Sequence, residues 1–462
     1  MVNKKWGLLI LTTFVIGNMV GGGIFMLPAQ LAQVSSPLGA TLAWIVTGLG
    51  VFLIALVFGN LAVRKPDLKA GPQSYAQSLF KSPVKGRVSG YSMAWGYWAA
   101  NWAATASVII SFAGYLSTFF PVMHSAKVIY TAGSFQLELG KALTFAVCSA
   151  ALWGIQAILV RSFNSAGKMN LFATVTKVLG FLFFIIITIF IFDTSNLGNG
   201  AEFYDKAGTA ISLGDQVNAA AISTLWAFIG IEAAVMLSNR AKSQNDVKKA
   251  TILGLLIAVA IYIGITLLTM GAISQDELKI SQKPLVDALQ AVVGSSGTYI
   301  MAALAVISLL GSTIGWIVVA SEVPYQAAKS DLFPAYFAKA NKNGTPVRSM
   351  TITNIMTQVF LFSTISGTIL EAYKFSMIVA TLAYLIPYLA SVLYQLKLVM
   401  TGETYDIMKG SRVRDGIITI LALIYSIWVI KTGTADMNTF ILGIALYVFG
   451  IILYPLWMRK KA

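Results

Sequence analysis

Glu232 and Lys177 lie inside long apolar stretches of this sequence, where a charged side chain is costly unless a partner or a function keeps it there. Trp226, Ile229 and Glu232 are three residues apart, so a continuous helix would place them on one side. An aromatic, an aliphatic and an acidic side chain next to Gly230 suit a binding cleft. The alternative is a structural glutamate that bonds a neighbouring helix. We interpret Glu232 as a functional residue.

Lys177 lies about two helical turns inside the nearer end of its apolar stretch. An ammonium group in hydrocarbon needs carbonyl or carboxylate partners. One hypothesis is that Lys177 contacts the backbone carbonyl groups that a break in the first helix leaves free. The alternative is a side chain that extends to the membrane surface, but the depth of Lys177 argues against it.

Two further apolar stretches carry polar and aromatic side chains. In residues 88–119, Asn101, Thr105 and Val108 follow at i, i+4 and i+7 and form one stripe between small alanines. This stripe fits ligand contact and interhelical hydrogen bonding equally well. In residues 297–327, Trp316 follows two hydroxyl residues. A lone tryptophan is often a packing residue, and Glu322 near the end of this stretch could pair with a loop lysine.

The first apolar stretch carries the strongest signal for an irregular backbone. Residues 15–25 contain Gly17, Asn18 and the three consecutive glycines Gly21–Gly23. Each glycine costs a helix roughly 1 kcal/mol relative to alanine, so this cluster favours a broken helix. Such a break is tolerated at membrane depth only where it lines a cavity or meets a ligand, and the second half-helix would then offer free N–H groups to an anion. Close helix packing is the alternative use of these glycines.

The composition shows what kind of chain must position these residues. Of 462 residues, 57% are hydrophobic and 11% are charged, and the mean hydropathy is +0.76. We expect an all-α, polytopic membrane protein. Cys148 is the one cysteine and His124 the one histidine, which excludes a disulfide within the chain and a Cys/His metal cluster. We therefore expect no metal site and no cofactor.

Apolar stretches of spanning length occur twelve times, and the charges between them indicate an orientation. With the N-terminus inside, 25 of the 33 lysines and arginines fall in the predicted inside segments and 7 in the outside segments; Lys177 is the remaining one. This asymmetry predicts that both termini are cytoplasmic. The net charge of +15 is then a topology signal, which removes the reason to expect nucleic-acid binding. The predicted spans are 7–33, 38–62, 88–119, 139–160, 169–192, 217–239, 250–273, 297–327, 350–369, 373–397, 415–431 and 438–458.

Several motifs resemble one family over nearly the whole chain. Gly17–Pro28 resembles the first-helix signature of the amino acid–polyamine–organocation (APC) transporters. Residues 97–121, 225–242 and 320–347 carry the same resemblance, which is nearest to the basic amino acid/polyamine antiporters and, among these, to arginine–ornithine exchangers. The resemblance implies twelve transmembrane helices, with spans one to five repeated as six to ten in inverted orientation and spans one and six broken. Residues 1–398 would then form the transport core, and residues 399–462 two additional helices.

The resemblance also implies roles for residues at matching positions. The substrate's carboxylate end would lie at the first break, and the third, sixth and eighth spans would supply the pocket walls. Glu232 and Lys177 would serve gating or proton coupling. Two positions depart from the pattern, because related antiporters often have a serine at Gly22 and an asparagine at Thr105. The implied substrate-binding residues are Met19, Gly22, Gly23, Asn101, Thr105, Val108, Trp226, Ile229 and Trp316.

The function that the resemblance implies is exchange of an external, basic amino acid for an internal related amino acid or its decarboxylated amine. A proton-coupled importer and an exchanger for histidine and histamine, tyrosine and tyramine, or lysine fit similarly. An intramembrane enzyme lacks a catalytic constellation, since the single histidine lies in an outer loop. The expected partners are a small-molecule substrate and the lipid bilayer, and a homodimer is compatible with the resemblance. The expected location is a bacterial plasma membrane, with sodium-independent exchange.

Overall fold

The computed structural model describes residues 5–68, 71–197, 200–204, 208–281, 283–406, 410–433 and 437–458. Ten segments of this described part are long and apolar enough to cross a bilayer, so the chain is a multi-pass membrane protein. They lie in α1 (Leu8–Met19) with α2 (Gly22–Val34), α3 (Pro37–Arg64), α5 (Pro83–Leu116), α6 (Leu139–Arg161), α7 (Phe163–Ile189), α8 (Leu213–Phe228) with α9 (Ala233–Met236), α10 (Gln244–Ala272), α12 (Pro284–Lys329), α15 (Ile369–Thr401) and α16 (Arg412–Gly433). The spanning segment begins at Ala166 within α7 and at Ser296 within α12.

The two other predicted spans are not among these ten segments. Stretch 350–369 is divided between α13 (Val347–Leu361) and the short α14 (Ser363–Ser366), and stretch 438–458 corresponds to α17 (Met437–Met458). The twelve-span count and the inverted repeat therefore stay predictions. The remaining helices are short connections: α4 (Pro72–Leu79), α11 (Gln275–Ile280) and the 3-10 turns η1 (Pro121–His124), η2 (Thr194–Leu197), η3 (Ser238–Arg240) and η4 (Ala335–Ala338).

One element departs from the expected all-α fold. Strands β1 (Val128–Ala132) and β2 (Phe135–Glu138) pair antiparallel as a hairpin between α5 and α6. Every β1 residue is exposed, so the hairpin adds nothing to the buried core. It is a local feature of one loop, and the fold is otherwise helical.

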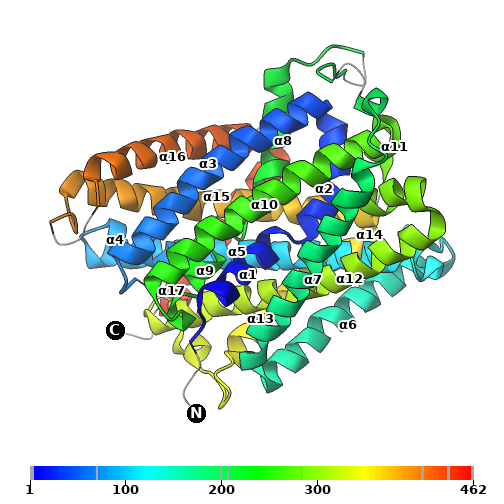
Figure 1. The fold of residues 1–462 in the computed structure, drawn as a ribbon. Helices are drawn as coiled ribbons and strands as arrows, with labels where there is room; N and C mark the ends of the chain where they lie inside the picture. The colour runs from blue at the N-terminus through cyan, green and yellow to red at the C-terminus, as the bar shows by residue number, and fades with distance from the viewer. Residues whose placement is uncertain are drawn as a thin grey trace.

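The long helices run side by side, with the broken pair α1–α2 through the middle of the bundle (Figure 1). Helix α1 ends at Met19 and α2 begins at Gly22, so the glycine cluster does interrupt the first span. A second interruption separates α8 from α9 at residues 229–232, where Gly230 has φ +105°. Both predicted breaks are therefore present, in spans one and six.

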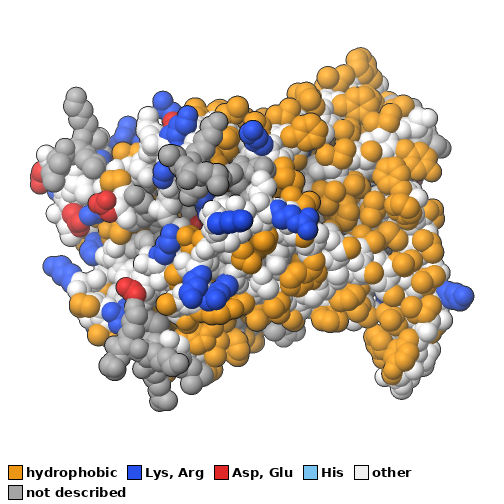
Figure 2. Space-filling model, turned by 90° about the horizontal axis from the view of Figure 1, so that it is seen from below, with side chains coloured by type: hydrophobic (Ala, Val, Ile, Leu, Met, Phe, Trp, Pro, Cys, Tyr) orange, Lys and Arg blue, Asp and Glu red, His pale blue; other side chains and the backbone are white. Residues whose placement is uncertain are grey.

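The surface separates into an apolar part and a basic part. In Figure 2 lysine and arginine side chains gather toward one end, whereas most of the remaining surface in that view is hydrophobic. An apolar belt beside a basic end is the arrangement expected of a protein that spans a bilayer. Some of the lysines and arginines that were counted for the predicted orientation lie outside the described residues. They are Lys4, Lys69, Lys206, Lys409, Arg459, Lys460 and Lys461.

Candidate ligand-binding site

The two helix breaks touch each other in the middle of the molecule. A Cβ atom added to Gly230 would lie 2.7 Å from the Cβ of Asn18 and 3.1 Å from the backbone nitrogen of Met19. The second break thus packs against the last turn of α1, directly before the first break. Gly22 and Gly23 open α2 beside them, where the first N–H groups of a helix have no intrahelical acceptor. This arrangement can receive a carboxylate through backbone donors.

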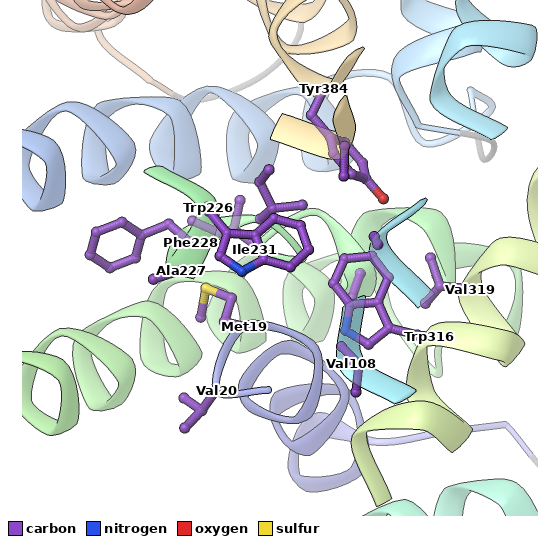
Figure 3. Close-up of a cluster of buried hydrophobic side chains, with 14 of the residues drawn as sticks. Met19, Val20, Val108, Trp226, Ala227, Phe228, Ile231, Trp316, Val319 and Tyr384 are labelled. Carbon is purple, nitrogen blue, oxygen red and sulfur yellow. The ribbon is translucent and has the colours of Figure 1, made fainter. Parts of the chain in front are cut away.

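Trp226 and Trp316 form the aromatic part of this centre. Their rings lie 6.2 Å apart between centroids with an interplanar angle of 17°, and Figure 3 shows them beside Met19. Each indole is fixed by its N–H group, because Trp226 Nε1 donates to the Tyr373 hydroxyl at 3.0 Å and Trp316 Nε1 donates to the Asn18 carbonyl at 3.2 Å. The structure therefore brings both predicted tryptophans to the first helix break.

The predicted α5 stripe forms a buried wall of this region. Asn101, Thr105 and Val108 are at most 1% exposed, and Val108 lies next to Trp316 in Figure 3. Asn101 donates to the carbonyl of Tyr97 at 2.7 Å, and Thr105 donates to that of Asn101 at 2.8 Å. The Oδ1 atom of Asn101 has no partner within the described residues. A buried acceptor left open in this way is available to a ligand or a water molecule.

The predicted continuous helix through Ile229 to Glu232 is wrong. Helix α8 ends at Phe228, and Ile229 is an extended residue with ψ 135°, so no continuous helix carries Trp226, Ile229 and Glu232 on one face. The break itself sets their directions. Ile229 is nevertheless buried in the core, and Glu232 lies at the start of α9.

Glu232 is held by three neutral donors. Its Oε1 accepts from the Tyr97 hydroxyl at 2.6 Å, and its Oε2 accepts from the Tyr388 hydroxyl and from the Gly230 N–H group at 3.2 Å. The side chain is 1% exposed. Neither tyrosine was predicted from the sequence as a partner of Glu232. Tyr97 precedes Asn101 by four residues on the polar stripe of α5 and could have been found there, whereas nothing local singles out Tyr388.

Lys177 contacts the first helix where the helix breaks. Its Nζ donates to the Gly17 carbonyl at 3.1 Å and to the Ser312 hydroxyl at 2.5 Å, and the side chain is 2% exposed. In a continuous helix the N–H of Gly21 would bond the Gly17 carbonyl, but here it bonds Met19. Lys177 thus takes the place of a lost backbone donor. Glu322, by contrast, pairs with Arg240 rather than with a loop lysine.

Replacement of Gly230 by alanine is expected to destabilise the closed arrangement of the two breaks. The new Cβ would overlap Asn18, and φ +105° is strained for any residue with a side chain. We expect a loss of about 1–3 kcal/mol of unfolding free energy together with reduced activity. Gly154→Ala is the control, because that helical glycine has open space around it. Thermal unfolding of both purified variants measures the effect, and equal melting temperatures would contradict it.

The site is closed in this structure. Met19, Val108, Trp226 and Trp316 are each at most 4% exposed, so protein side chains fill the centre. Within the described residues there is no group of three or more His, Cys, Asp and Glu side chains that could hold a metal ion. The groups at the centre are the backbone N–H donors at the start of α2, the Oδ1 atom of Asn101 and two indole rings, whereas the Glu232 carboxyl group and the Lys177 ammonium group are already bonded to neighbouring helices. Such groups can bind and release a small zwitterion.

The sequence matches the amino acid permease family over residues 7–456. The chain belongs to the amino acid permease family. This permease is 57% identical over 461 residues to a Bacillus subtilis protein named "Putative arginine/ornithine antiporter", with 99% of this chain and 98% of that protein covered. It is 33% identical to the arginine/ornithine antiporter of Pseudomonas aeruginosa (98% and 90% covered) and 32% identical to that of Latilactobacillus sakei (98% and 90% covered).

The match confirms the family that the sequence motifs indicated. The permease is a transporter and not an enzyme, and it acts on an amino acid in a membrane setting. Neither the particular substrate nor the roles of the central residues follow from the family alone.

Proposed function

We propose that this permease is an antiporter that exchanges external arginine for internal ornithine or a related amino acid or amine. The observation that carries the proposal is the meeting of two helix breaks around the parallel indoles of Trp226 and Trp316. The open N–H groups at the start of α2 would receive the α-carboxylate, and the indoles would receive the side chain. The names of the relatives agree with this substrate class.

The spacing of the two indoles suits a flat cation. Atoms in van der Waals contact lie about 3.5 Å apart, so a planar group between two rings needs about 7 Å from ring to ring. The centroids are 6.2 Å apart in the closed state. The two rings would therefore have to separate and face each other to admit a guanidinium group, which stacks on aromatic faces. The hydrogen bonds from Trp226 to Tyr373 and from Trp316 to Asn18 tie this opening to α15 and to the first break.

The remaining assignments belong to the same proposal. Residues 1–398 form the transport core with the inverted repeat, residues 399–462 add two helices, and the site opens alternately to the two sides of a bacterial plasma membrane. Both termini lie in the cytoplasm. The substrate-binding residues are Met19, Gly22, Gly23, Asn101, Thr105, Val108, Trp226, Ile229 and Trp316, with Glu232 and Lys177 in gating or coupling.

Transport in proteoliposomes tests the proposal. Vesicles loaded with ornithine should take up labelled arginine, whereas empty vesicles should not, and the same assay with other unlabelled amino acids identifies the preferred pair. A proton-driven importer is the second candidate, because Glu232 is a buried carboxyl group held only by neutral donors. Arginine uptake into empty vesicles under an inward proton gradient would favour that importer and contradict obligatory exchange.

Loss of either indole is expected to weaken substrate binding about tenfold or more. A cation on a desolvated aromatic ring gains roughly 1–2 kcal/mol, and 1.4 kcal/mol is tenfold in affinity. The measurement is the apparent affinity for arginine in Trp226→Ala and Trp316→Ala. Tyr373→Phe is the matched control, since it removes the hydrogen bond of the Trp226 indole but keeps both rings. Wild-type affinity in both tryptophan variants would exclude the indoles from the pocket.

A further inference from the structure

An open cavity of about 540 Å³ lies apart from the central cluster, between the C-terminal end of α5, η1, α11 and the start of α12. Its volume is in the range of sites that bind small molecules. Under the proposed orientation it lies on the external side. Its lining carries charges of both signs, from Glu277, Asp287 and Lys283, together with Gln290 and His124. A lining of this kind suits a ligand that is itself charged at both ends.

The two carboxylates of this cavity have room for a cation. Within the described part of the chain, no ion pair of 4 Å or less joins Glu277 or Asp287 to a lysine or arginine. Asp287 accepts a hydrogen bond from the Ser281 hydroxyl at 2.6 Å. Burial raises the pKa of Asp287, and the Ser281 hydrogen bond and the more distant Lys283 only partly oppose this effect. A cationic ligand would therefore stabilise the ionised carboxylate.

The cavity adjoins the elements that form the central site. Gly114 and Ser117 of the lining flank Tyr115, which lies seven residues beyond Val108 on α5 and donates to the Phe25 carbonyl of α2 at 2.8 Å. The rings of Tyr115 and Phe25 are 5.1 Å apart and form part of an aromatic layer at this end of the site. A ligand in the cavity would thus lie next to the outer half of the broken first helix.

Helix α11, which carries Glu277, is fastened to the same half-helix. Gln275 Nε2 donates to the carbonyls of Ala32 and Ser35 at 3.1 Å each, at the end of α2. The contact between α11 and α2 gives the cavity a fixed position relative to the first break. Movement of α2 during opening would therefore move one wall of the cavity with it.

We propose that this cavity is an outer binding site that takes a basic amino acid before it reaches the central site. Glu277 and Asp287 receive the cationic side chain, and Lys283 receives the α-carboxylate. The inference rests on the proposed function, because it takes arginine as the external substrate. It goes beyond that function by giving the external side a second site with its own charge preference. Carboxylates at an entrance also raise the local concentration of a cation and lose this effect as ionic strength rises.

The test compares neighbouring residues of α11. Glu277 lines the cavity, whereas Asp276 is 94% exposed, pairs with Lys279 and does not line it. The variants are Glu277→Gln, Asp287→Asn and the double variant, with Asp276→Asn as the charge-matched control. The apparent KM for external arginine is measured by uptake into intact cells, and the KM on the cytoplasmic side by uptake into inside-out vesicles.

We expect each single variant to raise the external KM roughly threefold and the double variant about tenfold, as for the loss of partly exposed charge pairs. The KM on the cytoplasmic side and the behaviour of Asp276→Asn should stay at wild-type values, and high salt should reduce the difference between variant and wild type. Since Glu277 is exposed, Glu277→Gln should fold even if Asp287→Asn does not.

Two results would overturn the inference. One is an external KM in the double variant that equals the external KM of Asp276→Asn. If only Glu277→Gln folds, the same comparison is made with that variant. The other is an equal rise of KM on both faces, which would indicate an effect on the central site. Failure of the proposed function has a different signature, because the wild-type protein would then not exchange arginine at all.

Discussion

Replacement of Glu232 by glutamine is expected to reduce exchange by about ten- to a hundredfold while the protein still folds and inserts. The folded structure tolerates the amide: its oxygen can accept from Gly230 and Tyr388, and the Tyr97 hydroxyl can rotate to accept from the new NH₂ group. What the variant loses is the ionisable carboxyl group at the second helix break. A buried hydrogen bond to a charged group contributes about 1.5–3 kcal/mol, which is one to two orders of magnitude in rate if it is needed in the cycle.

Matched variants distinguish the effect of the Glu232 charge from the effect of its hydrogen-bond partners. Tyr97→Phe removes one donor to Glu232 and keeps the carboxyl group, so it should slow exchange less than Glu232→Gln. Asp415→Asn changes another acid that is 1% exposed, which pairs with Arg64 away from the centre, and it should lower stability more than exchange. Exchange is measured as ornithine-driven arginine uptake per inserted protein. A wild-type rate in Glu232→Gln at normal expression would reject a gating or proton-coupling role.

Replacement of Lys177 by alanine is expected to lower the turnover rate more than the affinity for substrate. The ammonium group bonds the Gly17 carbonyl and Ser312, and thereby links α1 to α7 and α12 at the first break. Its removal leaves a buried carbonyl without a partner, at a cost of about 1–3 kcal/mol in the states where the contact forms. Lys177 is not part of the indole pair, so the bound substrate should be affected only indirectly.

The same contact predicts exchange that does not depend on sodium. A sodium-coupled transporter needs a cation site built from carbonyls and hydroxyls near a broken helix, and here a fixed ammonium group takes up such partners. Ser312→Ala is the control for the hydroxyl contact, because it keeps the bond from Lys177 to Gly17. Rates and apparent affinities are compared in sodium-free and sodium-containing buffers. Sodium-stimulated wild-type exchange, or wild-type turnover in Lys177→Ala, would contradict the proposed role.

Part of the site could be found from local sequence because the signals were local. Three consecutive glycines at membrane depth indicated a break, and the break lies between Met19 and Gly22. The spacing of Asn101, Thr105 and Val108 indicated one face of a helix, and all three are buried in α5. A charge inside an apolar stretch needs carbonyl or carboxylate partners, and together with the family resemblance this requirement indicated a contact between Lys177 and the carbonyls of the first helix.

The second break was harder to interpret from spacing. A single glycine weakens a helix only slightly, so periodicity continued the helix through Ile229 to Glu232. In the structure the chain leaves the helix at Phe228, because Gly230 packs against Asn18 with a positive φ that only glycine adopts easily. That contact joins residues 212 positions apart in the chain, and no local pattern contains it.

Hydropathy, charge asymmetry and motifs are properties of single segments, so they were enough to indicate a mostly helical membrane permease with an interrupted first span. Which side chains meet became clear only from the packed helices. The partners of Glu232, the stacking of Trp226 on Trp316, and the bond from Lys177 to Gly17 each join different helices. Such contacts depend on how helices rotate and pack against one another, which the sequence of each helix restricts but does not specify.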